Sequence, residues 1–282
     1  MTVADLDRLA GLLADRPWCV LTGAGMSTDS GIPDYRGPDG TRRVTPVTYH
    51  EFVRSPAVRA RYWARAYAGW HRFRGARPNA AHRAVAWLED AGVASAVITQ
   101  NVDRLHQDAG SQHVVDLHGT LQRTVCLECG ARAHRDDVHA TIEHLNPSFA
   151  RIAEDAARGR ARPDGDVDLP AAALEGFVAP SCPACGADAL KPDVVFFGES
   201  VPKPRVERCF ALVDAARGLL VLGSSLTVFS GYRFVRHAAA RGVPVAIITR
   251  GTTRGHADAA LTLDAGLSDA LPALVARLGG PP

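Results

Sequence analysis

Four of the six cysteines form two Cys-x-x-Cys pairs, and these pairs limit the fold more than any other feature of the sequence. The first pair is Cys126 and Cys129, and the second is Cys182 and Cys185. Two such pairs supply the four thiolates of a tetrahedral zinc ribbon, where a closed ligand set makes the ion structural. Redox-active thiols are the alternative. Since a metal site suits a reducing compartment better than disulfides do, we predict a cytoplasmic protein.

The length and composition allow a full hydrophobic core. At 282 residues and 46% hydrophobic, the chain suits one large domain and a smaller one. Its formal charge of +2 is too small to predict nucleic acid or an anionic membrane as a partner. There is no long apolar run of the kind that spans a membrane, and the N-terminus has no basic segment followed by an apolar one. We therefore expect neither a membrane-bound nor a secreted protein.

An apolar run from residue 18 to residue 21 stops abruptly at Thr22-Gly23-Ala24-Gly25. Small residues after a strand expose backbone N–H groups to an anion, and a dinucleotide pyrophosphate binds there in βα units. The third glycine of the usual Gly-x-Gly-x-x-Gly pattern is Thr28 here, so an ordinary strand–turn–helix junction explains the segment equally well.

The following segment, residues 30–36, is rich in turn formers and ends in Asp34-Tyr35-Arg36. Arg36 is suited to pairing with a phosphate, and Tyr35 to covering a ribose or a flat ring. An ordinary polar surface loop is the alternative.

Polar side chains also follow two later apolar runs. Residues 93–99 precede Gln100-Asn101-Val102-Asp103, and residues 218–222 precede Gly223-Ser224-Ser225. The apolar runs are typical of buried parallel strands, whose carboxyl ends bind ligands in open α/β sheets. The alternative for Asn101 is a helix N-cap. The sequence thus predicts an α/β fold with a Rossmann-like parallel sheet.

One of the eleven histidines follows a short apolar run into a turn, in Leu117-His118-Gly119. A lone histidine is usually structural, but one in such a turn can titrate near neutral pH and act as a general base. We therefore select His118 as the catalytic candidate.

In their order and spacing these motifs resemble those of the sirtuins, NAD-dependent protein-lysine deacylases. The resemblance covers nearly the whole chain and implies NAD as co-substrate, one structural zinc ion, and acylated lysines of proteins as substrates. It implies that His118 and Asn101 are catalytic. The NAD-binding residues that it implies are Gly23, Ala24, Gly25, Met26, Ser27, Thr28, Asp34, Tyr35, Arg36, Gln100, Asn101, Val102, Asp103, Gly223, Ser224, Ser225, Thr249, Arg250, Gly251 and Leu267. Thr249 replaces an asparagine common in the family, which puts the adenosine-ribose contact there in doubt.

Two further segments concern the substrate. An apolar run beside a Gly-Glu turn can add a peptide as a strand, and the same segment forms one wall of the lysine cleft in sirtuins. It contains Val195, Phe196, Phe197, Gly198 and Glu199.

Tyr62 and Arg65 would share a helical face. They resemble the Tyr-x-x-Arg pair of sirtuins that remove acidic acyl groups, so they favour a glutaryl-type group. The alternative is a packed tyrosine with an arginine in solvent.

Residues 130–181, between the cysteine pairs, form a long segment that we name the insert. A similarly long segment is seen in class II sirtuins and their mitochondrial member. The insert contains Asp164, Asp166 and Asp168, with Glu175 at the twelfth place of a calcium-loop pattern. Leu169 occupies the position that needs glycine, so we reject calcium.

The predicted domains are discontinuous in the chain. Residues 1–37, 78–121 and 188–282 form the Rossmann-like domain. Residues 38–77 are the helical part of the small domain, and residues 122–187 its zinc-ribbon part with the insert.

The predicted reaction transfers an acyl group from lysine to ADP-ribose and releases nicotinamide and O-acyl-ADP-ribose. One alternative is a protein ADP-ribosyltransferase that uses the same NAD site. Another is a non-enzymatic zinc-ribbon binding module, although the low charge and the lack of a basic stripe do not favour nucleic acid. A Rossmann dehydrogenase lacks the expected acid about twenty residues after the loop. The sequence does not predict the oligomeric state.

Overall fold

The fold is taken from a computed structural model that describes residues 2–14, 17–37, 40–157 and 162–281. The chain forms two compact units, which we name unit 1 and unit 2 and describe separately. Unit 1 consists of Met1–Arg43, Arg77–Leu117 and Val201–Pro282. Unit 2 consists of Val44–Ala76 and His118–Ser200.

Unit 1 contains a six-stranded sheet in the order β3-β2-β1-β7-β8-β9. Every neighbouring pair is parallel, as predicted from the buried apolar runs. The strands are β1 (Trp18–Thr22), β2 (Ala94–Thr99), β3 (Val114–Asp116), β7 (Gly218–Leu222), β8 (Val245–Thr249) and β9 (Leu261–Asp264). Taken in chain order within the unit, this is the Rossmann order 3-2-1-4-5-6, whose switch point lies between β1 and β7.

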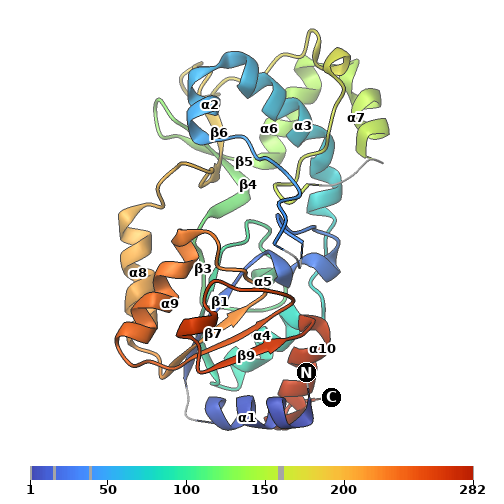
Figure 1. Ribbon diagram of the computed structural model, residues 1–282. Helices are drawn as coiled ribbons and strands as arrows, with labels where there is room; N and C mark the ends of the chain where they lie inside the picture. Colours follow the sequence, from blue (N-terminus) through green and yellow to red (C-terminus); the bar gives the residue numbers. More distant parts are fainter. Residues whose placement is uncertain (1, 15–16, 38–39, 158–161, 282) are drawn as a thin grey trace. The chain divides into compact units, whose positions relative to one another are not determined.

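Alternation along each strand builds two hydrophobic cores, one on each face of the sheet. Val20 and Leu220 pack on one face with α1 (Val3–Leu13), α4 (Ala80–Asp90) and α10 (Leu267–Arg277). Leu21 and Val221 pack on the other with α8 (Lys203–Asp214) and α9 (Phe229–Ala240). Unit 1 is therefore a three-layer α/β/α structure, whose helices are labelled in Figure 1.

Local signals set the helix starts of unit 1. Thr2 and Asp5 form a reciprocal capping box at the start of α1, as their spacing predicts. Asn79 caps α4 by accepting from the backbone N–H groups of Ala81 and His82. The last helix, α10, begins at Leu267 without a side-chain cap, although the next residue, Ser268, is a common capping type that the sequence predicts as the cap of this helix. The shorter helices are α5 (Leu105–Asp108) and the 3₁₀ turns η1 (Ala24–Met26), η2 (Thr28–Ser30) and η4 (His256–Asp258).

Unit 2 combines a three-stranded antiparallel sheet, in the order β5-β4-β6, with helices. Its strands are β4 (Gly119–Cys126), β5 (Arg132–His134) and β6 (Leu190–Val194). Its helices are α2 (Tyr49–Arg54), α3 (Pro56–Arg74), α6 (Arg135–Leu145), α7 (Phe149–Ala157) and the 3₁₀ turn η3 (Ala171–Leu174). The antiparallel pairing of β4 with β6 brings the two cysteine pairs together.

The unit boundaries differ in four places from the domain ranges predicted from the sequence. Residues 40–43 and Arg77, predicted for the small domain, belong to unit 1. Residues 118–121 and 188–200 belong to unit 2 and not to the Rossmann-like unit. The reason is β-pairing: Gly119 in β4 lies opposite Val194 in β6, so both segments follow the zinc-ribbon sheet. Residues 38 and 39, at the start of a predicted range, lie outside the described residues.

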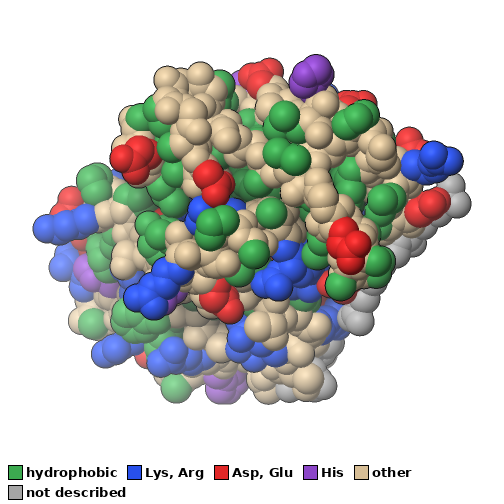
Figure 2. Space-filling view, turned by 90° about the horizontal axis from the view of Figure 1, so that it is seen from above, with side chains coloured by type: hydrophobic (Ala, Val, Ile, Leu, Met, Phe, Trp, Pro, Cys, Tyr) green, Lys and Arg blue, Asp and Glu red, His purple; other side chains and the backbone are tan. Residues whose placement is uncertain are grey.

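None of the helices in the described residues has both the length and the apolar character needed to cross a membrane. Acidic and basic side chains are both present on the face that Figure 2 shows, with hydrophobic ones among them. This mixture agrees with the small formal charge of the chain, +2.

Candidate active site and metal centre

The glycines after β1 and β7 allow two loops of unit 1 to touch through their backbones. The N–H of Gly25 donates to the carbonyl of Gly223 at 2.9 Å. A Cβ on Gly25 would lie 2.9 Å from the Cα of Gly223, and one on Gly23 would lie 2.8 Å from the Cβ of Ser224. Gly223 also has a φ of +62°, which favours glycine. The sequence explained these glycines by approach to a ligand, whereas the structure shows that packing between the loops requires them as well.

Three predicted NAD-binding side chains form one hydrogen-bonded cluster at the ends of β1 and β2. Asn101 donates through Nδ2 to the Ser27 hydroxyl at 3.0 Å, and Ser27 donates to Asp103 Oδ2 at 2.7 Å. Asp103 Oδ1 also accepts from the N–H of Leu105 at 3.0 Å. Burial raises the pKa of the Asp103 carboxyl, although these bonds favour its charged form. Asn101 thus binds Ser27, and the alternative of a helix cap is not observed.

Gln100 joins the ends of β1, β2 and β7. Its Nε2 donates to the carbonyl of Thr22 at 3.2 Å and to the Ser224 hydroxyl at 3.0 Å. Ser224 also accepts from the N–H of Leu226, a buried residue with a positive φ of 55°. The side chain of Ser225, by contrast, contacts Thr227. The polar residues of three separate motifs therefore meet at the carboxyl edge of one sheet, beside its switch point.

Other residues of the first loop make hydrogen bonds and ion pairs with neighbouring residues of the chain. Arg43 lies 2.8 Å from Asp34, and Arg36 donates to the carbonyl of Gly40 at 2.9 Å. Tyr35 accepts through its carbonyl from the N–H of Arg43. The Thr28 hydroxyl donates to the carbonyl of Gly25 at 3.2 Å. The first three of these contacts join residues 34–36 to residues 40–43 within unit 1.

Residues predicted near the adenosine lie along β8 and the start of α10. Thr249 is buried at the end of β8, while Arg250 is exposed. The N–H of Gly251 donates to Asp264 at 3.2 Å. Leu267 is also buried, and its Cδ1 lies 2.9 Å from where a Cβ on Gly223 would be. Leu267 therefore packs against Gly223 in the loop after β7.

His118 is the first residue of the second segment of unit 2, and its backbone bonds to the substrate segment predicted from the sequence. Its carbonyl accepts from the N–H of Val195 at 2.8 Å. Gly119, which follows, has a φ of +80°, and a Cβ there would lie 2.0 Å from the carbonyl oxygen of Asp193. Only glycine allows this close approach of β4 to β6. The half-buried His118 thus lies at the start of β4, next to Val195.

A buried lysine shapes the rest of that segment. Lys191 Nζ donates to the carbonyl of Val194 and lies 3.1 Å from Glu199. Glu199 in turn accepts from the N–H of Phe196 at 2.8 Å. The carbonyl of Phe197 accepts from the N–H of Tyr49 at 2.9 Å, and Gly198 takes the left-handed conformation of the turn. Sequence reasoning missed Lys191, although it is one of only two lysines in the chain.

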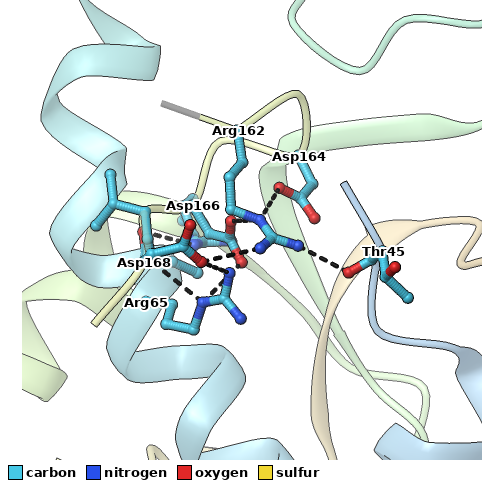
Figure 3. A network of polar contacts seen from close by, with 9 residues as sticks. Thr45, Arg65, Arg162, Asp164, Asp166 and Asp168 are labelled. Carbon is cyan, nitrogen blue, oxygen red and sulfur yellow. Dashed lines mark hydrogen bonds and ion pairs between the residues drawn. The ribbon is translucent and has the colours of Figure 1, made fainter. Parts of the chain in front are cut away.

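The side chains of Tyr62 and Arg65 contact different parts of unit 2 and do not form a shared binding site. Tyr62 is buried, with its ring against Phe52 and Phe196 and with Arg135 as the neighbouring positive charge. Burial raises the pKa of the Tyr62 hydroxyl, so it stays protonated. Arg65 instead faces the insert, as Figure 3 shows.

Arg65 and Arg162 bind the three acids that resembled a calcium loop. Arg65 lies 2.9 Å from Asp168 and 3.4 Å from Asp166, and it donates to the carbonyl of Val167 at 3.1 Å. Arg162 lies 2.7 Å from Asp166, where the two atoms are not aligned as a hydrogen bond and the contact is an ion pair. These arginines neutralise the acids, which is a second reason against calcium (Figure 3).

The same insert is tied to two other parts of unit 2. Arg162 donates to the carbonyl of Thr45 at 2.8 Å and lies 3.7 Å from Asp164. Gly69 of α3 has no side chain to keep the insert away, since a Cβ there would lie 2.4 Å from the carbonyl oxygen of Gly165. The sequence contained the signal for this network only as alternating acids, with nothing to indicate which arginines would reach them.

The four predicted zinc ligands form one cluster in unit 2. The sulfur atoms of Cys126, Cys129, Cys182 and Cys185 all lie within 4.8 Å of one another. The Sγ atoms of Cys126 and Cys185 are 3.7 Å apart, and those of Cys129 and Cys182 are 3.8 Å apart. A tetrahedron with zinc–sulfur bonds of about 2.3 Å places its sulfurs about 3.8 Å apart. The donor set therefore fits one structural zinc ion, with no position left for a substrate.

Comparisons with known proteins agree with this geometry. The Sir2 family model matches residues 23–230. A curated relative, NAD-dependent protein deacetylase 1 of Mycobacterium avium (strain 104), is 50% identical over 280 residues, which are 99% of this chain and 98% of that protein. A solved structure described as Sir2 with a p53 peptide and NAD+ has a TM-score of 0.76 at 30% identity, over 97% of this chain and 98% of the other. Another, described as Sir2 bound to acetylated peptide, has a TM-score of 0.74 at 28% identity, over 97% and 98% of the two chains.

Proposed function

Since this chain belongs to the Sir2 family, we propose that it removes acetyl groups from lysine side chains of proteins, with NAD consumed as co-substrate. The observation that carries the proposal is the meeting of three motifs at one sheet edge. Ser27, Asn101 and Asp103 share hydrogen bonds there, and Gln100 links them to Ser224. Short polar side chains fixed to one another in this way are suited to binding ribose hydroxyls and a carboxamide.

In the proposed reaction Asn101 and Asp103 hold the nicotinamide ribose. Restraint and desolvation of that end favour loss of nicotinamide, which leaves an oxocarbenium-like centre at C1′. The acyl oxygen of the substrate lysine attacks C1′. His118 takes a proton from a ribose hydroxyl, so that the 2′-oxygen attacks the resulting imidate carbon. Addition of water completes the products, which are free lysine, nicotinamide and O-acyl-ADP-ribose.

The substrate peptide is proposed to lie along residues 195–199. The carbonyl of His118 accepts from the N–H of Val195, which supports a histidine adjacent to the bound lysine. Lys191 and the N–H of Phe196 both bind the Glu199 carboxylate, which fixes the turn beside which the peptide would lie. The four cysteines would hold zinc away from the reacting atoms, where it stabilises the β4–β6 sheet.

Among acyl groups we propose that uncharged ones are preferred. The acidic preference predicted from Tyr62 and Arg65 requires a free guanidinium, but Arg65 is bound to Asp166, Asp168 and the carbonyl of Val167. A negatively charged acyl group would have to displace these carboxylates. The relative and the solved complex are named for deacetylation and for an acetylated peptide, which agrees with this preference.

Mass spectrometry of one lysine peptide, carrying an acetyl, glutaryl, hydroxymethylglutaryl or lipoyl group, tests the proposal. We expect NAD-dependent loss of acetyl with an equal amount of O-acetyl-ADP-ribose, and no loss without NAD. Faster loss of glutaryl, abolished in Arg65→Ala but not in Arg61→Ala, an exposed arginine on the same helix, would restore the acidic preference. ADP-ribose on an acceptor protein, without acyl loss from any peptide, would establish the transferase instead.

A further inference from the structure

Two buried histidines of unit 1 have no part in the reaction described above. His82 on α4 is 0% exposed and His106 on α5 is 1% exposed. Their rings meet edge to face, with centroids 5.0 Å apart. His82 Nε2 and His106 Nδ1 have no hydrogen-bond partner among the residues that the structure describes. A buried ring nitrogen without a hydrogen-bond partner lowers the stability of the fold, so two such nitrogens side by side need an explanation.

On one side, His106 leads to the backbone of Asn101. His106 Nε2 lies 3.0 Å from the Thr22 hydroxyl, which donates to the Thr99 hydroxyl at 2.9 Å. The N–H of Asn101 donates to the same Thr99 oxygen at 3.1 Å. Because Thr22 uses its proton on Thr99, His106 must donate through Nε2, and its Nδ1 is left without a proton.

On the other side, His82 leads to the loop after β1. His82 Nδ1 lies 3.0 Å from Asn79 Oδ1, an oxygen that can only accept. Asn79 Nδ2 donates to the carbonyl of Met26 at 2.9 Å. The next residue, Ser27, is bonded to Asn101 at 3.0 Å. The N–H of Asn79 also lies 3.4 Å from His82 Nδ1, so His82 contacts both the side chain and the backbone of Asn79. Asn79 in turn bonds the loop after β1.

The two paths form a closed ring of contacts. It runs from His82 through Asn79, Met26 and Ser27 to Asn101, and returns through Thr99, Thr22 and His106. The contact between the two imidazoles closes it. We propose that His82 and His106 are positioning residues, which hold the Met26–Ser27 backbone and Asn101 at the spacing that NAD requires. This inference rests on the proposed function.

The ring requires both imidazoles to be neutral. Burial lowers the pKa of His82 to about 4, with Arg83 as the neighbouring charge, and burial also lowers the pKa of His106, with His82 as the neighbouring charge. Asp103, the other titratable group of the site, bonds to Ser27 and Leu105 and not to either ring. A proton on either histidine would therefore place an uncompensated charge beside the second ring. NAD binding is expected to persist at pH 6 and to weaken as the pH falls toward 4.

The test measures NAD binding to the full-length protein by calorimetry, together with the KM values for NAD and for an acetylated peptide. His106→Leu removes the bond to Thr22, whereas the side-chain amide of His106→Gln can keep it. We expect His106→Leu to weaken NAD binding and raise its KM about tenfold, with the peptide KM unchanged. His106→Gln should remain within about threefold of the natural protein.

Thr99→Val provides a second variant should His106→Leu fail to fold, because it removes only the hydroxyl of the ring at similar volume. Equal NAD affinity in Thr99→Val, His106→Leu and the natural protein would overturn the proposal, as would equal losses in His106→Leu and His106→Gln. These results differ from failure of the proposed function, in which the natural protein itself binds no NAD.

Discussion

The sheet edge of unit 1 and the insert of unit 2 both contain buried polar side chains, but different interactions hold them. At the sheet edge the groups are short and mostly uncharged, and Ser27, Asn101 and Gln100 bond across loops that parallel strands bring together. In the insert the groups are long and charged, and Arg65 and Arg162 surround Asp166. The first arrangement follows from strand register, whereas the second depends on contacts between distant segments of the chain.

This difference has consequences for stability. A neutral hydrogen bond contributes about 1 kcal/mol to the free energy of unfolding. Its loss costs no more than this when the remaining partner can bond to water instead. A buried charge that loses its partner costs several kcal/mol. Unit 2 should therefore respond more strongly than unit 1 to single substitutions and to pH.

The largest effect is expected for Arg162→Ala. The substitution removes the cation between Asp164 and Asp166 and the bond to the carbonyl of Thr45. The free energy of unfolding should fall by about 3 kcal/mol at pH 8, and by less at pH 5, where Asp166 is protonated. Denaturation followed by hydrogen exchange of α3 measures this loss. A loss below about 0.5 kcal/mol at both pH values would contradict the prediction, because it would mean that these buried ion pairs contribute no more than exposed ones.

The next effect concerns pH and Asp166. Burial and the neighbouring Asp164 raise the pKa of the Asp166 carboxyl to about 8 against the pull of two arginines. A raised pKa stabilises the folded state fully below about pH 4, and this contribution disappears as the pH rises through about 8. Stability should fall steadily between pH 5 and pH 8 in the natural protein. Asp166→Asn should remove this slope, and a slope of the same size in that variant would contradict the assignment.

A smaller effect is expected at the sheet edge, for Ser27→Ala. It removes the hydroxyl that bonds Asn101 and Asp103, and Asp103 is 8% exposed. We expect a loss of about 1.5 kcal/mol in unfolding free energy, together with weaker NAD binding. Ser95→Ala is a matched control, since that hydroxyl bonds only the carbonyl of Trp18 at 3.3 Å. Equal losses in the two variants would show that the cluster adds nothing specific.

The smallest effect is expected for Asp168→Asn. Its carboxylate bonds Arg162 of the insert and Arg65 of α3, but its side chain is 71% exposed. Exposed ion pairs contribute about 0.5 kcal/mol, so thermal unfolding should shift by only one or two degrees. A shift as large as that of Arg162→Ala would mean that exposure does not weaken this network.

The sheet edge could be predicted because its determinants are local. Each motif follows an apolar strand, and parallel strands end at one edge, so Gln100 and Ser224 had to lie near Gly23. The cysteine pairs were equally informative, because four thiolates at that spacing have one common geometry. The prediction did not include the reason for the glycines, since the contact of Gly25 with Gly223 depends on the relative height of two loops.

The insert and the acyl-binding residues were less predictable. The spacing of Tyr62 and Arg65 correctly gave a shared helix, but the partner of each side chain comes from a distant segment. Arg135 lies seventy-three residues after Tyr62, and Asp166 about a hundred after Arg65. The periodicity of residues within one helix does not predict contacts with such distant segments. The ring of His82 and His106 escaped notice for the same reason, because their pairing depends on how α4 packs against α5.

The central claim is that His118 is the general base of an NAD-dependent deacetylase, and one kinetic measurement tests it most directly. The rate of O-acetyl-ADP-ribose formation is compared in the natural protein, in His118→Ala and in His50→Ala, an exposed histidine of unit 2. We predict a loss of at least about a hundredfold in His118→Ala alone, with NAD affinity and circular dichroism unchanged. Formation of O-acetyl-ADP-ribose at the natural rate by His118→Ala would contradict the account.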